Sequence, residues 1–148
     1  MSVSVRSLEA GDHEPWARLY AGYADFYKVV QTAAMRATVW DWLRDPACEV
    51  EGLVAVDAAG RVIGIAHFRG FRRPLSASVG GFLDDLFVDP DARGSGAAQA
   101  LIAGIKEVGR ARGWSVIRWI TAADNARARA VYDTLTVATP WVTYDIKL

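Results

Sequence analysis

The segment DDLFVDPDARGSGAA, residues 84–98, gathers side chains that could carry out chemistry on a charged substrate. It begins with two adjacent carboxylates, Asp84 and Asp85, in an otherwise apolar run. It ends with Arg93 and five small residues, Gly94-Ser95-Gly96-Ala97-Ala98. Small residues at a helix start let a ligand reach N–H groups that have no intrahelical partner, and the helix dipole favours an anion there. The pattern predicts a pyrophosphate site, with a tight strand-to-helix turn as the structural alternative.

This glycine loop differs from two well-known phosphate-binding loops. No Lys-Ser or Lys-Thr pair follows the glycines, as it would in a Walker-type nucleotide loop. The loop also lacks the spacing and the position of a dinucleotide-binding fingerprint. Taken alone, the two glycines do not decide between a ligand site and a turn.

The two carboxylates could attract an ammonium group, and one of them could take its proton directly or through water. Because side chains alternate along a strand, we expect Asp84 and Asp85 on opposite faces of the sheet. The structural alternative is an ion-paired sheet edge, with Arg69 or Arg72 as the partner.

Strand and helix patterns intermix along the chain and would position these residues. Strand-like runs cover residues 2–8, 50–56, 61–71, 82–88, 115–121 and 141–148, and residues 74–81 read as a loop. Helix-like runs cover residues 16–27, 32–44, 95–112 and 125–134, and Gly113 can cap the third. We therefore predict one α/β domain over residues 1–148, with a mixed, mostly antiparallel twisted sheet flanked by helices.

Composition argues against several classes of protein. Seventeen Lys and Arg balance seventeen Asp and Glu without a long block of one sign, which disfavours a nucleic-acid partner. Cys48 is single, and no Cys/His spacing suits zinc, so we expect no metal. His13 and His67 are far apart, and we expect each to be a surface or hydrogen-bonded core residue. With no signal pattern and no run near ~20 apolar residues, we expect a cytoplasmic protein without membrane contact.

Two motifs in the second half of the chain resemble the GNAT acetyltransferase superfamily. Arg93, Gly96 and Ala98 match its pyrophosphate-binding pattern, and the preceding Leu86-Phe87-Val88 matches the strand that holds the pantetheine arm. Downstream, the stretch DNARARAVYD matches a second element through Asn125, Ala128 and Tyr132. The segment DDLFVDPDARGSG is most similar to the diamine and polyamine branch, in which the first acidic position matches Asp84.

The resemblance implies a single GNAT-type domain that transfers acetyl from acetyl-CoA, without a metal, directly to the primary amine of a small molecule. That acceptor would be a polyamine, an amino acid or a related amine. A backbone N–H of residues 86–88 would stabilise the carbonyl oxygen. The implied cofactor-binding residues are Leu86, Phe87, Val88, Arg93, Gly94, Ser95, Gly96, Ala97, Ala98, Asn125 and Ala128.

The resemblance also assigns catalytic and acceptor-binding roles. Tyr132 would protonate the departing thiolate, with packing on the sheet as its structural alternative. Asp84 would act as the base or as a base relay, while Asp85, Asp25 and Tyr27 would bind the acceptor. Asp25 and Tyr27 could equally be structural, and for the nearby aromatics Phe26 and Trp16 we expect core packing.

Two other functions and an oligomeric state also fit this pattern. A protein-lysine acetyltransferase would need a broad acceptor groove, and a non-catalytic CoA-binding sensor would bind without turnover. After Tyr132 the chain reads DTLTVATPW, where many relatives continue with a Gly-aromatic pair, so the last strands depart from the pattern. The final strand, WVTYDIKL, would be an edge strand, and we expect it to support a homodimer.

Overall fold

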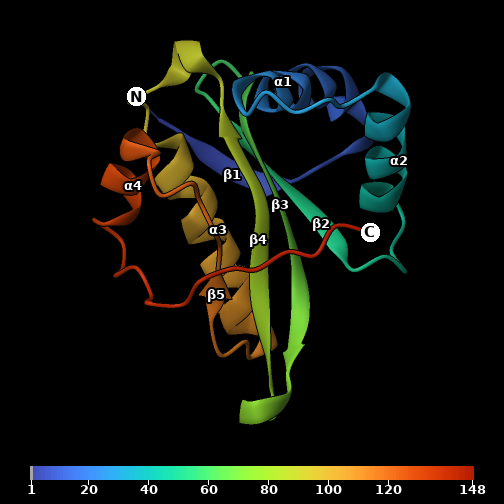
Figure 1. The fold of residues 1–148 in the computed structure, drawn as a ribbon. Helices are drawn as coiled ribbons and strands as arrows, with labels where there is room; N and C mark the ends of the chain where they lie inside the picture. The colour runs from blue at the N-terminus through green and yellow to red at the C-terminus, as the bar shows by residue number, and fades with distance from the viewer. Residues whose placement is uncertain (1) are drawn as a thin grey trace.

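The computed structural model describes residues 2–148 and contains one five-stranded sheet whose strands lie in sequence order (Figure 1). The strands are β1 (Ser4–Ser7), β2 (Val50–Val56), β3 (Val62–Arg73), β4 (Ser78–Val88) and β5 (Ile117–Arg118). Strands β1 to β4 pair antiparallel with one another, whereas β5 pairs parallel with β4. The predicted mixed, mostly antiparallel sheet is confirmed.

Helices cover both faces of the sheet. They are α1 (His13–Phe26), α2 (Ala33–Arg44), α3 (Ala97–Arg112) and α4 (Ala126–Tyr132). Along β2, Leu53 and Ala55 join the core under α3, whereas Val54 and Val56 join the core under α1. Because both faces are covered, β2 and β3 are apolar without strict alternation, as buried strands are. No helix in residues 2–148 has the length and apolarity to cross a bilayer.

Strand β4 begins earlier than predicted, within the stretch that we expected to be a loop. Gly80 and Gly81 belong to the strand because they pair with Phe71 and Gly70 of β3, and the Trp114 ring lies over Gly81. A Cβ atom on Gly81 would lie 2.4 Å from the ring of Trp114, so only glycine fits under the indole. Glycine in a strand therefore reports close packing here, not a break.

The expected final strand at 141–148 is wrong: residues 136–148 form neither helix nor strand. Val142, Tyr144 and Ile146 recur at every second position, yet their exposed fractions are 73, 89 and 88%. Alternation makes a segment able to pair, but a strand also needs a neighbouring backbone. In the sheet β5 is the edge strand nearest the C-terminus, and it pairs with β4 over only two residues.

Candidate active site

A β-bulge in β4 determines where the two carboxylates point. His67 of β3 lies opposite Asp85, and the next residue, Phe68, lies opposite Leu83, so Asp84 is the extra residue. Leu83 and Leu86 both belong to the α3 side of the sheet, which leaves the two residues between them on the α1 side. The expectation of one carboxylate on each face was wrong, because the bulge interrupts the two-residue period.

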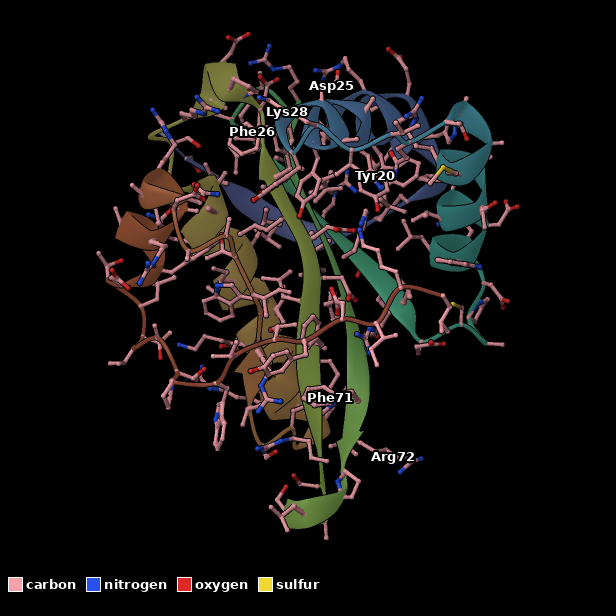
Figure 2. The ribbon with its side chains drawn as sticks, in the orientation of Figure 1. Tyr20, Asp25, Phe26, Lys28, Phe71 and Arg72 are labelled. Atoms are coloured by element: carbon pink, nitrogen blue, oxygen red, sulfur yellow. The ribbon has the colours of Figure 1, made fainter. Side chains whose placement is uncertain are left out.

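Asp84 forms an ion pair with Arg69. The Arg69 Nε atom lies 3.0 Å from Oδ2 and 3.3 Å from Oδ1 of Asp84. Burial raises the pKa of the Asp84 carboxyl, the Arg69 cation opposes this shift, and the neighbouring Asp85 adds to it. The other proposed partner, Arg72, lies near the far end of the β3–β4 hairpin (Figure 2). Asp84 is thus an ion-paired carboxylate that still reaches solvent.

Asp85 is held by a hydrogen-bonded network under α1. Its Oδ2 atom accepts a hydrogen bond from the Tyr20 hydroxyl at 2.9 Å and lies 2.8 Å from Nδ1 of His67. The Trp16 indole Nε1–H donates to His67 Nε2 at 2.8 Å. The expectation of a hydrogen-bonded core histidine is confirmed for His67, which is 1% exposed, while His13 lies on the surface. No local sequence signal links these four residues, because they meet only across the sheet.

A row of aromatic rings connects this network to the region of Phe87. The Tyr23 ring centroid lies 6.2 Å from that of Tyr20, 4.9 Å from that of Tyr27 and 5.8 Å from that of Phe87. Burial, followed by the charge of Asp85, raises the pKa of both Tyr20 and Tyr23 well above the usual value. The two hydroxyls therefore stay protonated and can donate hydrogen bonds.

Asp25 lies apart from the carboxylate pair. It is exposed on the outer side of α1, whereas Tyr20 lies beneath the helix (Figure 2). It lines a separate hollow with Arg18 and Asp89. The structure therefore does not bring Asp25 together with Asp85, because Asp25 lies on the outer side of α1 whereas Asp85 lies beneath this helix, bonded to Tyr20.

A cavity of about 300 Å³ lies between the end of α1, the C-terminal part of β4, the start of α3 and α4. All the residues predicted to bind the cofactor line it, together with Tyr27 and Tyr132. Five further lining residues were not predicted for this site: Phe26, Ala92, Gln99, Arg127 and Val131. Phe26 is 51% exposed, so its expected core role is wrong, whereas Trp16 is fully buried as expected.

The start of α3 is open toward this cavity. Gly94 and Gly96 have φ values of +79° and +85°, and no protein atom lies within 4 Å of a Cβ built on either. The Ser95 hydroxyl accepts a hydrogen bond from the Ala97 N–H at 3.3 Å. Within residues 2–148, the N–H groups of Gly96, Ala98 and Gln99 have no protein acceptor. This geometry suits an anion, although a role in binding stays a prediction.

The open edge of β4 provides further N–H groups. Pairing between β4 and β5 ends at Phe82, opposite Arg118. Farther along, the Asp89 N–H donates to the Ile63 carbonyl at 2.8 Å, on the β3 side. Because successive N–H groups alternate in direction along a strand, those of Leu86 and Val88 point toward the gap beside β5. These are the backbone donors that could meet a carbonyl oxygen in the cavity.

Tyr132 fits both interpretations made from the sequence. Its ring packs against Trp119, with centroids 5.3 Å apart, and it also lines the cavity. Burial, with a smaller contribution from Tyr27, raises the pKa of Tyr132 to about 12. Asn125 caps α4 by accepting the Ala128 N–H at 3.3 Å, and its amide donates to the Tyr27 hydroxyl at 3.3 Å. Tyr132 therefore lines the cavity with a hydroxyl that is protonated at neutral pH, and its ring is packed against Trp119.

Most of the chain that builds this site matches a known family model. Residues 16–135 match the acetyltransferase (GNAT) family. The chain belongs to this family. It is a GNAT acetyltransferase enzyme, and acetyl-CoA is the acetyl donor that the family uses.

Relatives of known activity and structure cover nearly the whole chain. It is 27% identical over 143 residues to the D-amino-acid N-acetyltransferase HPA3 of Saccharomyces cerevisiae, covering 96% of this chain and 89% of that one. A ribosomal-protein-alanine N-acetyltransferase structure from Brucella melitensis biovar Abortus 2308 has a TM-score of 0.82 at 25% identity, with full coverage of both chains. The aminoglycoside acetyltransferase HMB0005 from an uncultured soil sample has a TM-score of 0.75 at 25% identity, covering 100% and 99%.

Proposed function

We propose that this GNAT enzyme transfers acetyl from acetyl-CoA directly to the primary amine of a small molecule. The observation that carries the proposal is the continuity of the site. The open start of α3 meets the free edge of β4 in one cavity. The same strand then leads back from Leu86 to the carboxylates Asp85 and Asp84, which precede it by one and two residues and lie just outside the cavity lining. An anion-binding end and an amine-binding end are thus joined by a single backbone.

The residues at the cavity end fit the donor. The N–H groups of Gly96, Ala98 and Gln99 would receive the pyrophosphate, with Arg93 supplying a permanent positive charge. When bound, acetyl-CoA supplies the acetyl thioester. The Val88 or Leu86 N–H would donate to its carbonyl oxygen, and a preorganised donor of this kind contributes about 3–4 kcal/mol.

The residues near the bulge would handle the acceptor and its protons. Asp85 binds the acceptor ammonium, and Asp84 takes one proton from it, directly or through water. The raised pKa of Asp84 supports this role, since a stronger base accepts the proton more readily. The amine nitrogen then forms the new bond to the acetyl carbon as the carbon–sulfur bond breaks, and Tyr132 gives its proton to the departing thiolate. The acylated nitrogen loses its second proton to the Tyr132 oxygen, directly or through water, which restores the phenol. Holding both reactants together removes much of the entropic barrier.

An amino acid is the acceptor that we favour over a polyamine. The D-amino-acid N-acetyltransferase relative acts on substrates that carry a carboxylate beside the amine. Arg69 uses its Nε toward Asp84, and its two terminal nitrogens have no hydrogen-bond partner among residues 2–148. A zwitterion could therefore place its ammonium at Asp85 and its carboxylate at Arg69. A polyamine would use the two carboxylates but would leave the two terminal nitrogens of Arg69 without a partner.

A thiol-release screen tests the proposal. Purified protein and acetyl-CoA are incubated with D- and L-amino acids, polyamines and lysine peptides, and with no acceptor as the control for hydrolysis. We expect thiol release above that control with amino acids. Thiol release only with lysine peptides would indicate that the acceptor is a protein and not a small molecule. Coenzyme A binding without thiol release with any of these acceptors would favour a non-catalytic CoA-binding sensor.

A protein acceptor is the second candidate. The structural similarity to a ribosomal-protein-alanine N-acetyltransferase supports it, since that protein acts on a polypeptide amine. Including peptides with a free N-terminal alanine in the screen separates this candidate from a lysine acetyltransferase.

We also propose a homodimer that pairs the C-terminal segment of one copy with the other. Exposed Val142, Tyr144 and Ile146 support this, because burying one strand face would remove them from water. Light scattering of the full chain should give twice the mass of 16.1 kDa. A monomer at high concentration would contradict the proposal.

A further inference from the structure

The buried imidazole behind Asp85 has only one arrangement of protons that satisfies its neighbours. The Trp16 indole nitrogen is a donor only, and it lies 2.8 Å from His67 Nε2. Nε2 must therefore accept, and in neutral imidazole the single proton then lies on Nδ1. That proton faces Asp85 Oδ2 at 2.8 Å. The tryptophan thus selects the tautomer that donates to the carboxylate.

Protonating His67 would break this arrangement. A proton on Nε2 would face the Trp16 N–H with no acceptor between them, in a side chain that is 2% exposed. The other groups around the imidazole do not offer an alternative acceptor for Nε2. Tyr20 lies edge-on to the imidazole ring at 4.7 Å and gives its proton to Asp85, and Asp84 is engaged by Arg69. Tyr23 adds a second protonated hydroxyl in the same aromatic row.

We propose that His67, with its tautomer selected by Trp16, is a positioning residue that holds Asp85 ready to bind the acceptor ammonium. Two donors, His67 Nδ1–H and the Tyr20 hydroxyl, converge on one oxygen of Asp85, Oδ2. The other oxygen, Oδ1, has no hydrogen-bond partner among residues 2–148. The Asp85 side chain is 21% exposed, so its free Oδ1 can reach a ligand. The two donors on Oδ2 therefore fix the orientation of the Asp85 carboxylate and leave Oδ1 for the ligand. This role rests on the proposed acetyl transfer to an amine.

Nitrogen NMR of the wild-type enzyme tests the imidazole itself. The chain contains only two histidines, so comparison with a His13→Gln variant assigns both rings. We expect the neutral His67 ring in the Nδ1–H form, because Nε2 accepts from the Trp16 indole. The Nε2–H form would overturn the proposal. This measurement needs no substrate and no change to the core.

A pair of isosteric variants tests the effect on the acceptor. In His67→Asn the amide nitrogen replaces Nδ1 and keeps the donor to Asp85. In His67→Gln the side-chain oxygen replaces Nε2, which keeps the Trp16 acceptor but removes the donor. We expect His67→Gln to raise KM for the amine by about tenfold to a hundredfold, the size of a hydrogen bond to a charged group.

The His67→Asn variant should keep KM within about threefold of the wild type, which a merely structural loss of the ring would not allow. Binding of coenzyme A, measured by calorimetry, and the melting temperature show whether each variant is folded. Equal KM changes in the two variants, or an unchanged KM in His67→Gln, would overturn the positioning role. If the wild-type enzyme acetylates no amine at all, the acceptor role falls with the proposed function, while the NMR result still decides the tautomer.

Discussion

The substitution Gly96→Glu tests whether the start of α3 holds the diphosphate of coenzyme A. Gly96 has φ +85°, and the space that a side chain would enter contains no protein atom within 4 Å. Gly60 provides a matched control, because it has φ +83° and equally open surroundings in the β2–β3 turn. Either substitution puts an L-residue in a left-handed conformation, at a cost of about 1–2 kcal/mol. The two variants should therefore lose similar stability.

Only the Gly96 variant should lose binding. A carboxylate about 4 Å from a phosphate charge is repelled by about 4 kcal/mol at an effective dielectric constant of about 20. Repulsion of this size raises Kd by up to about a thousandfold, and overlap of the side chain with the ligand adds to it. Because Gly96 is partly exposed, screening by salt reduces the charge effect, so calorimetry at low and high salt separates repulsion from overlap.

The assay is calorimetric titration of each variant with coenzyme A, beside thermal melting without ligand. Wild-type affinity in Gly96→Glu would refute the assigned site, since a glutamate at the N-cap of α3 would repel and overlap a diphosphate bound there. Equal loss of affinity in Gly60→Glu would also refute the reasoning, because it would make the effect a consequence of lower stability.

Two further predictions concern titrating groups. Tyr132→Phe should lower kcat by about a hundredfold or more while coenzyme A affinity is kept, with the exposed Tyr144→Phe as the control. Because the pKa of Tyr132 is about 12, this hydroxyl should cause no loss of activity until the pH approaches that value. Full kcat in the Tyr132→Phe variant would refute its role as the acid. Asp12→Asn should cost about 1–3 kcal/mol of unfolding free energy, since Asp12 accepts two hydrogen bonds from Arg6 at 2.8 and 3.0 Å. The Arg6 cation lowers the pKa of Asp12, so this stabilisation is present above the unfolded value of about 3.9 and is lost as the pH falls through the lower folded value. Chemical denaturation at several pH values, with Asp145→Asn as control, should show the difference disappearing in acid; a difference that persists there would contradict the ion-pair origin.

The parts of the fold that sequence could predict are those with local causes. The apolar stripe of α3 and its cap were readable because Gly113 has φ +74°, a conformation that glycine favours. The β2–β3 hairpin was readable from Gly60, which again has positive φ. In both elements one residue's own backbone preference carried the signal. The cavity residues near Gly94 and Gly96 were predicted instead from small residues at the start of a helix and from the resemblance to the GNAT superfamily.

The parts that sequence missed depend on partners distant in the chain. Whether residues 141–148 form a strand depends on a neighbouring backbone, so alternation could not decide it. The network of Trp16, His67 and Asp85 joins three elements separated by up to 69 positions, and no short window contains it. Trp16 was expected as a core residue, which it is, but its burial conceals a hydrogen bond that only the folded sheet reveals.

The bulge at Asp84 determines which groups β4 presents on its face toward α1 and along its edge beside β5. Without it, strict alternation would place one of the two carboxylates on the face covered by α3, where it would lie in an apolar core at a high cost. With it, both carboxylates face α1, while Leu83 and Leu86 keep that core continuous. Beyond the bulge, the N–H groups of Leu86 and Val88 turn toward the gap beside β5. One inserted residue therefore lets β4 present acids on one face and backbone donors on its edge, which are the two kinds of group that the proposed transfer from a thioester to an amine would use.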